Sequence, residues 1–226
     1  KKFLIFIALL IYKKVPGLIN KVLDDKISEI KKKVEESFTD SILVKKTIVD
    51  QNLYQVLLQA GDIISKSIAK GGKLLICGNG GSAADAQHLA AEFLIRLTSD
   101  VNRESIPALS LAQDTSTLTA CINDYGPDDI FKRTFSALSS KGDTLLAITT
   151  SGKSKNIIET LKLGRERDIY TIGFLGNGGG EALEYCDSAF IVPGKITARI
   201  QESHITAGHA LMELVENNLL ESGYIN

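Results

Sequence analysis

One segment decides the fold of this chain: Lys73-Leu-Leu-Ile-Cys-Gly-Asn-Gly-Gly-Ser-Ala-Ala-Asp-Ala-Gln-His-Leu-Ala-Ala-Glu-Phe93. The apolar run at residues 74–77 predicts a short buried strand. The glycine-rich residues 78–81 predict a tight turn, and Ser82 is expected to cap the helix that follows. Bare backbone N–H groups and the positive end of a helix dipole both favour anions. This junction therefore predicts a site for a phosphate or a carboxylate.

Three interpretations of the glycine turn compete. The spacing Gly78-x-Gly80-x-x-Ala83 fits the loose dinucleotide-binding fingerprint, which also requires an acid at the end of a second strand about 20 residues later. Asp100 lies at that distance, but no strand is predicted before it. A purely structural turn is the second interpretation. A phosphate site for a small substrate is the third, and it is the one we favour.

A second loop, Thr149-Thr-Ser-Gly-Lys-Ser154, follows another predicted strand. Its Gly-Lys-Ser ending matches the end of a P-loop, but Ala147 stands where that motif requires its first glycine. Hydroxyl groups and a glycine before a helix again predict an anion site. Ligands of open α/β sheets bind at the carboxyl ends of strands, which favours a functional role over a structural turn.

Four side chains are candidates for acid–base chemistry or metal binding. His88 and Glu92 are four residues apart and so share one face of a helix, although most such pairs are a packed histidine and a surface carboxylate. Gln201 and His209 are two turns apart on the last predicted helix, about 80° apart around its axis, so both can border one cleft. Together the four could bind zinc or a similar divalent ion. His204 is expected to be packed or solvated instead.

Strands and helices alternate after residue 93. Strands are expected at residues 105–111, 143–149, 170–175 and 189–192, and helices at 114–121, 128–138, 156–167 and 202–217. This alternation predicts an α/β fold with a parallel sheet covered by helices on both faces. Before residue 73, helical apolar spacing at 19–38 and 40–69 predicts a helical N-terminal arm.

The composition fits a globular protein. The chain has 226 residues, of which 44% are hydrophobic and 23% charged, and its net charge is -1, so neither disorder nor nucleic-acid binding is expected. The three scattered cysteines predict reduced structural thiols in a cytosolic protein. The apolar run at residues 3–12 is too short to span a bilayer and lacks a signal-peptidase site. We interpret it as an appended segment.

Four ordered motifs resemble those of the phosphoheptose isomerases (sedoheptulose 7-phosphate isomerases), a family of the sugar isomerase (SIS) domain superfamily. They are the segments 78–92, 123–126, 149–154 and 199–209. The resemblance runs from about residue 38 to the C-terminus. It implies a single SIS domain at residues 38–226, with a flavodoxin-like three-layer α/β/α arrangement, preceded by an apolar and helical extension at residues 1–37.

The resemblance also implies the roles of individual residues. Glu92 and His209 match the catalytic pair. The zinc ligands of some members correspond to His88, Glu92, Gln201 and His209, with one ion per subunit. Substrate contacts are expected from Asn79, Gly80, Gly81, Ser82, Glu92, Asn123, Asp124, Thr149, Thr150, Ser151, Ser154 and Gln201. Three positions differ from other members of the family. Many members have Ser where this chain has Thr149, and the hydroxyl group is kept. Some have Asn in place of Lys153, and some have Asp in place of Ala198.

The implied activity is the conversion of sedoheptulose 7-phosphate to D-glycero-D-manno-heptose 7-phosphate through an enediol. This is the first step toward ADP- or GDP-heptose for lipopolysaccharide, capsule or surface-layer glycans. A cytoplasmic homotetramer with active sites at subunit interfaces is implied, with neither nucleic acid nor membrane as partner. The alternatives are a non-catalytic SIS protein that binds the replication initiator DnaA and a sugar-phosphate sensor. The presence of Glu92, Gln201 and His209 favours the enzyme.

Overall fold

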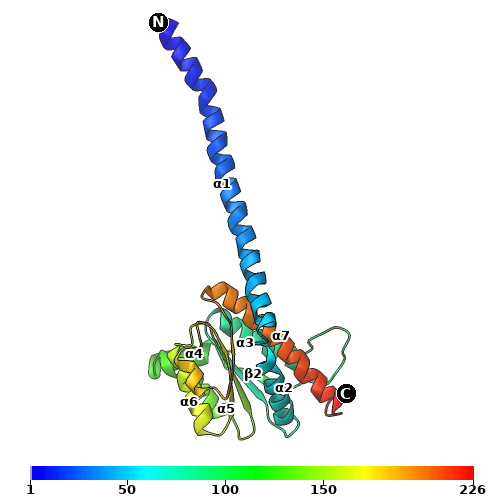
Figure 1. The fold of residues 1–226 in the computed structure, drawn as a ribbon. Coiled ribbons are helices and arrows are strands. Elements are labelled where there is room, and N and C mark those ends of the chain that lie inside the picture. Colours follow the sequence, from blue (N-terminus) through cyan, green and yellow to red (C-terminus); the bar gives the residue numbers. More distant parts are fainter. Residues whose placement is uncertain (1, 113) are drawn as a thin grey trace. The chain divides into compact units, whose positions relative to one another are not determined.

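The computed structural model describes the backbone of residues 2–112 and 114–226, and their side chains from residue 21 onward (Figure 1). The chain divides into two compact units, Lys1–Leu43 and Val44–Asn226. The apolar run expected at residues 3–12 lies within the first helix, outside the residues whose side chains are described.

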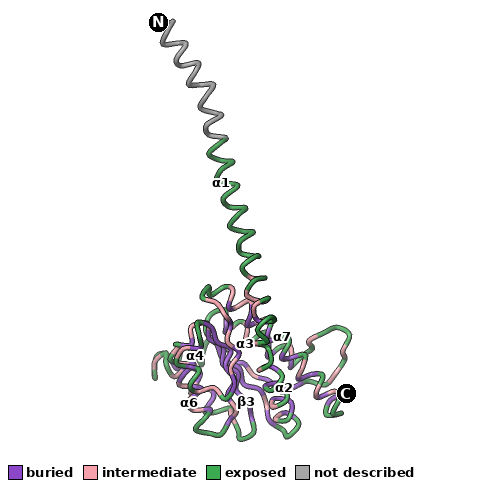
Figure 2. Tube along the Cα trace, in the orientation of Figure 1, coloured by how far each residue is buried: buried purple, intermediate pink, exposed green. Residues whose placement is uncertain are grey.

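The N-terminal arm is helical, as expected. Helix α1 covers Lys2–Asp50 without a break, and α2 covers Gln55–Ile68. Residues 21–40 are exposed throughout (Figure 2). Surface ion pairs at i,i+4 spacing, such as Glu29–Lys33 at 2.6 Å, support this part of α1. Within the part of the chain that the structure describes, no helix has an apolar stretch long enough to span a bilayer.

A parallel sheet of five strands forms the centre of the second unit. Its strands are β1 (Leu74–Gly78), β2 (Ala108–Ser110), β3 (Thr144–Thr149), β4 (Tyr170–Leu175) and β5 (Ser188–Ile191). The strand order is β2-β1-β3-β4-β5, and every adjacent pair is parallel. The expected α/β class is confirmed. Strand β2 is shorter than residues 105–111.

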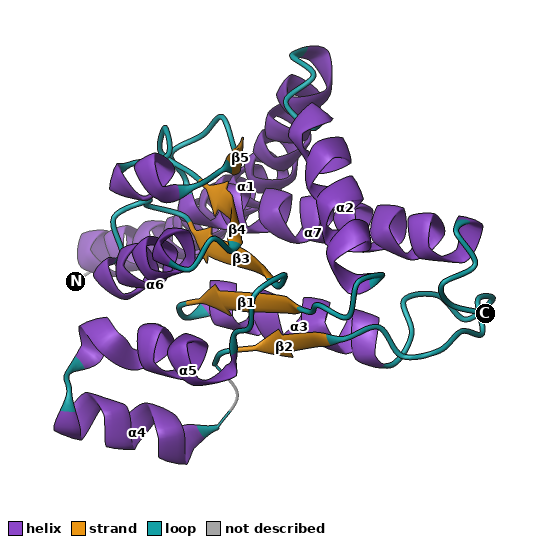
Figure 3. Ribbon diagram, turned by 90° about the horizontal axis from the view of Figure 1, so that it is seen from below, coloured by secondary structure: helices purple, strands orange, loops and turns teal. Residues whose placement is uncertain are grey.

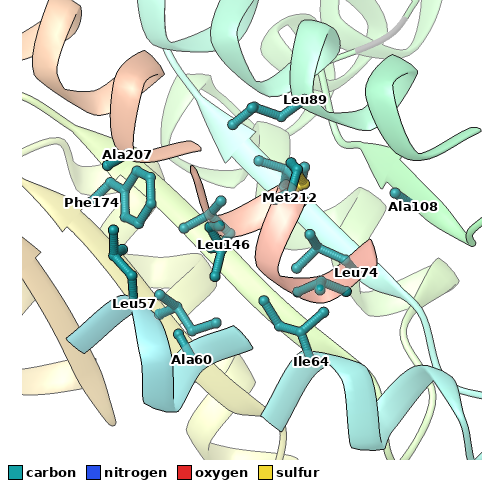
Figure 4. Close-up of a cluster of buried hydrophobic side chains, with 14 of the residues drawn as sticks. Leu57, Ala60, Ile64, Leu74, Leu89, Ala108, Leu146, Phe174, Ala207 and Met212 are labelled. Carbon is teal, nitrogen blue, oxygen red and sulfur yellow. The ribbon is translucent and has the colours of Figure 1, made fainter. Parts of the chain in front are cut away.

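Helices cover both faces of the sheet (Figure 3). The remaining ones are α3 (Gly81–Leu94), α4 (Thr115–Asp124), α5 (Ile130–Leu138), α6 (Lys155–Glu166), α7 (Thr197–Glu221) and the short 3-10 turns η1 (Pro127–Asp129) and η2 (Glu181–Tyr185). On one face, side chains of α2, α3 and α7 pack against alternate strand residues such as Leu74, Leu146 and Phe174 (Figure 4). On the other face, α5 and α6 pack against Leu75 and Leu145. The strands are thus buried on both sides, as parallel sheets are.

The start of α3 differs from the prediction. Ser82 does not cap this helix, because α3 begins one residue earlier, at Gly81, and no side chain caps it. Gly80 has φ 55°, a conformation that glycine adopts without strain, and this lets the chain turn directly from β1 into the helix. A Cβ atom on Gly78 would lie 2.4 Å from the carbonyl oxygen of Ser82. The buried Ser82 therefore packs inside the first turn.

The cysteines are free thiols, as expected. Cys77 and Cys121 are buried, and burial raises the pKa of both thiols. Thiols of this kind react slowly and serve packing.

His204 is packed rather than solvated. Its side chain is completely buried on α7 against the rings of Phe174 and Phe190. Its Nε2 lies 3.1 Å from the carbonyl oxygen of Leu175, at the end of β4, whereas Nδ1 has no partner among the described residues. Burial lowers the pKa of His204 to about 4. The imidazole is therefore neutral in the folded protein.

The first prediction concerns the pH dependence of stability. The pKa of His204 is about 4 when folded and about 6.5 when unfolded. The contribution of the neutral His204 to the free energy of unfolding is therefore fully present above about pH 6.5. It falls by about 1.4 kcal/mol per pH unit as the pH drops toward 4. Urea unfolding should show that wild type loses about 2 kcal/mol more than His204→Gln between pH 6.5 and 5. Equal losses would contradict the buried neutral imidazole.

Candidate functional site

The two predicted anion loops meet beyond the carboxyl ends of the neighbouring strands β1 and β3. The chain turns in opposite directions from β1 and β3, since β2 lies outside β1 and β4 lies outside β3. Ligands of open α/β sheets bind at such a switch point, beyond the carboxyl ends of the strands. The side-chain amides of Asn79, after β1, and Asn156, at the start of α6, exchange two hydrogen bonds of 2.9 and 3.0 Å. The glycine turn and the loop after β3 are therefore neighbours.

The loop after β3 gathers hydroxyl groups around one point. Thr149 Oγ1 accepts a hydrogen bond from the backbone N–H of Gly152 at 3.2 Å and lies 3.3 Å from Ser154 Oγ. Ser151 Oγ lies 3.5 Å from Thr149 Oγ1 and accepts from the backbone N–H of Lys153. Helix α6 begins directly after this loop. Hydroxyl groups and a helix N-terminus at one place suit a phosphate group.

Gly152 is required by the packing of this loop. Its φ is +63°, and a Cβ atom there would lie 1.9 Å from the carbonyl oxygen of Gly179. Two hydrogen bonds, both 2.9 Å long, also join this loop to the segment after β4. Asn177 Nδ2 donates to the carbonyl oxygen of Thr150, and the backbone N–H of Ala182 donates to the carbonyl oxygen of Gly152. The hydroxyl groups are therefore presented by a fixed backbone.

Helices α3 and α7 bring three of the candidate side chains together. His88 Nε2 lies 2.8 Å from His209 Nε2 and 3.3 Å from Glu92 Oε1. One ligand atom from each residue lies within 4.8 Å of the others, so the group could hold a metal ion. Two imidazole nitrogens and one carboxylate oxygen are a donor set that zinc and several transition metals accept.

This cluster is open to solvent on one side. The side chain of His88 is 49% exposed, whereas that of Glu92 is 16% exposed. Behind it the helices are in close contact, because a Cβ atom on Gly208 would lie 2.7 Å from Leu89. A substrate could thus approach His88 while the carboxylate remains largely shielded from water.

Gln201 lies at the other end of the contact between α3 and α7. A Cβ atom on Gly81 would lie 2.5 Å from Gln201 Nε2, so the amide rests on the first turn of α3. Gln201 and His209 are eight positions apart on the helix, which is about 12 Å along the axis. The structure therefore places Gln201 beside the glycine turn and groups the other three predicted metal ligands with one another.

Sequence reasoning did not single out Asp85. It lies one turn before His88, and burial raises the pKa of its carboxyl group, while His88 and His209 act in the opposite direction. Its Oδ2 is buried and has no hydrogen-bond partner among the described residues. The spacing of Asp85, His88 and Glu92, at i, i+3 and i+7, is the signal that could have revealed a third polar side chain on this face.

Asn123 and Asp124 lie in the last turn of α4 and hydrogen-bond to each other at 2.7 Å. Asp124 lines a cavity of about 500 Å³ formed by β2, α4 and α5, in which Arg133 stacks 3.5 Å from the centre of the Tyr125 ring. The residues lining this cavity include none from the glycine turn or from the loop after β3. In this structure, then, Asp124 lines a cavity to which neither loop contributes, and Asn123 is hydrogen-bonded to Asp124.

Comparisons with known proteins agree with one another. Residues 37–176 match the SIS domain family. A phosphoheptose isomerase of Thermodesulfovibrio yellowstonii is 42% identical over 85% of this chain and 94% of its own length. One from Paramagnetospirillum magneticum is 50% identical over 72% of this chain and 82% of its own. The structure of a phosphoheptose isomerase from Neisseria gonorrhoeae has a TM-score of 0.77 and 39% identity, covering 83% of this chain and 99% of that one.

The second prediction is that the cluster binds a divalent ion. Cobalt(II) is a suitable probe because its visible spectrum reports nitrogen and oxygen ligands. We expect one ion per chain, and His209→Ala should weaken binding at least about tenfold because it removes a ligand. His204→Gln is the matched control, since His204 is completely buried elsewhere on the same helix. Unchanged cobalt affinity in His209→Ala would exclude the cluster as the metal site.

Proposed function

The chain belongs to the phosphoheptose isomerase family of SIS-domain proteins, and we propose that it converts sedoheptulose 7-phosphate to D-glycero-D-manno-heptose 7-phosphate. The observation that carries this proposal is the grouping of His88, Glu92 and His209 on the helix that starts at the glycine turn and on its neighbour. A carboxylate and two imidazoles beside an anion site suit the isomerisation of a phosphorylated sugar.

The reaction moves a carbonyl group from C2 of the ketose to C1 of the aldose. A base must take a proton from C1, and a proton must then be added to C2, so an enediol lies between the two sugars. We propose that Glu92 is the base that takes the proton from C1 and returns it to C2. Its carboxylate is largely shielded from water. His209 transfers a proton between O2 and O1 or assists ring opening. No other reactant is consumed, because the proton that Glu92 removes is returned.

The phosphate group is proposed to bind the loop after β3. The hydroxyl groups of Thr149, Ser151 and Ser154 lie together just before α6, and Thr150 is proposed to add a fourth. Ser82 and the glycine turn are proposed to complete the site from the other side of the Asn79–Asn156 hydrogen bonds. Binding energy from this remote group is available to orient the reacting carbons. Asn79, Gly80 and Gly81 are proposed to contact the sugar from the β1 side, and Asn123 and Asp124 from α4.

The metal is proposed to be zinc, one ion per subunit. His88, Glu92 and His209 would hold it, and Glu92 has a second carboxylate oxygen for proton transfer. A zinc ion at this place would polarise the carbonyl oxygen or hold the site together. Gln201 is the proposed fourth ligand, a role that requires its side chain to reach along α7 toward His209. Its place beside Gly81 supports its other proposed role as a substrate contact.

We propose a cytoplasmic homotetramer with active sites at subunit interfaces, which supplies heptose for lipopolysaccharide, capsule or surface-layer glycans. Exposed apolar side chains of α1, such as Ile30, Val34 and Phe38, support contacts with other subunits. Residues 38–226 are proposed as the SIS domain, in keeping with the family match over residues 37–176.

The third prediction tests the catalytic carboxylate. The wild-type protein should convert sedoheptulose 7-phosphate to the aldose, as followed by NMR of the sugar carbons. Glu92→Gln keeps the shape of the side chain but removes the base, so kcat should fall at least about 100-fold.

A chelator, followed by added zinc, tests the metal in the same assay, and gel filtration checks that the assembly is intact. An active Glu92→Gln variant would refute the role of this residue. Saturable binding of the sugar phosphate without turnover by wild type would identify a sensor instead.

The fourth prediction tests the phosphate loop. Gly152→Ala forces a Cβ atom against the carbonyl oxygen of Gly179 at positive φ. It should raise KM for the sugar phosphate at least about tenfold, since the loop that carries the hydroxyl groups must shift. Gly142→Ala is the matched control: Gly142 also has positive φ but a Cβ there would meet nothing within 4 Å. A wild-type KM in Gly152→Ala would contradict phosphate binding at this loop.

A further inference from the structure

Arg103 is a buried arginine in the segment between α3 and β2. Its side chain is 0% exposed, and its Nε donates to Glu216 on α7, whose side chain is 3% exposed. Its other two nitrogens donate to main-chain carbonyl oxygens: Nη2 to Glu92 at 2.7 Å, and Nη1 to Phe93 and to Glu104, both at 2.9 Å. The guanidinium group thus contacts two helices and its own loop at once.

The contacts with Glu92 and Phe93 complete the end of α3. The last carbonyl groups of a helix have no partner within it, and they form the negative end of its dipole. A guanidinium group satisfies both needs, because it is positively charged and its planar fork reaches several acceptors. The backbone N–H of Ile106 also donates to the carbonyl oxygen of Phe93 at 2.9 Å. The end of α3 is therefore fixed by the segment that follows it.

The two partners of Arg103 belong to the helices that carry the acid–base cluster. On α3 it binds the main chain of Glu92 itself. On α7, Glu216 lies seven residues after His209, which is two turns along the same face. One side chain therefore connects the backbone of the proposed base with the helix of the proposed proton-transfer histidine.

We propose that Arg103 is a positioning residue which, with Glu216, sets the spacing of α3 and α7 at His88, Glu92 and His209. This inference rests on the proposed function of that cluster. Ligands and catalytic groups must be held within about 0.5 Å of their working geometry. Residues that orient ligands from behind typically change metal affinity or activity about 10- to 100-fold when they are removed.

A purely structural ion pair is the alternative, and the two can be separated. Removing one partner leaves a buried charge unpaired and destabilises a protein strongly, whereas replacing both by apolar residues is often neutral. Arg103→Met/Glu216→Leu therefore removes the connection without leaving a buried charge unpaired. A structural pair would leave the cluster unaffected in this variant.

The experiment measures cobalt(II) affinity and steady-state kinetics of the full chain with Arg103→Met/Glu216→Leu. We expect cobalt affinity and kcat each to fall at least about tenfold, with KM within about threefold of wild type because the phosphate loop is untouched. Wild-type cobalt affinity and kcat in the folded double variant would overturn the proposal.

Arg103→Lys provides a second measurement should the double variant not fold. It keeps the charge beside Glu216 but loses the fork, so we expect an intermediate loss of cobalt affinity, and wild-type affinity would overturn the proposal. Lys73→Met is the matched control, since it breaks the ion pair with buried Asp143 at the opposite end of the strands. If wild type binds cobalt but does not isomerise the sugar, the proposed function fails while cobalt affinity still tests Arg103.

Discussion

The close contact between α3 and α7 is the constraint on which the site depends. Glycines permit it at two levels, where Gly81 accommodates Gln201 and Gly208 accommodates Leu89. Because both positions lack a side chain, the helices approach closely enough for His88 and His209 to meet at 2.8 Å. A methyl group at Gly208 would press on the buried side chain of Leu89, whereas one at Gly81 would displace the amide of Gln201.

Helix α3 also connects the two halves of the chemistry. It starts at the glycine turn after β1 and ends at the carbonyl groups that Arg103 binds. The turn reaches the hydroxyl loop through the Asn79–Asn156 hydrogen bonds, and the helix carries Glu92 two turns beyond Asp85. Helix α3 thereby holds the side chains proposed for proton transfer at a fixed distance from a phosphate bound at the strand ends.

The parts of the site are anchored unequally. Helices α3 and α7 contribute many residues to the main core. Of the residues in α4, all of which are described, Cys121 alone is buried. Asn123 and Asp124 belong to this weakly anchored helix, and Asp124 lines a separate cavity. Few buried contacts mean a low local stability, so the helix predicted to meet the sugar is less constrained by packing than α3 and α7.

The sequence by itself determined the strand–turn–helix at residues 74–94, the parallel α/β class and the pairing of His88 with Glu92, because these follow from local periodicity. The family resemblance implied that His209 acts with this pair, and the tertiary structure places the Nε2 atoms of His88 and His209 2.8 Å apart. The tertiary structure alone decided that Gln201 rests on Gly81 and that Arg103 joins Glu92 to Glu216. It also moved the start of α3 from Ser82 to Gly81, since a positive φ is a property of the folded backbone. Contacts between segments distant in the chain depend on how helices pack, which local patterns do not encode.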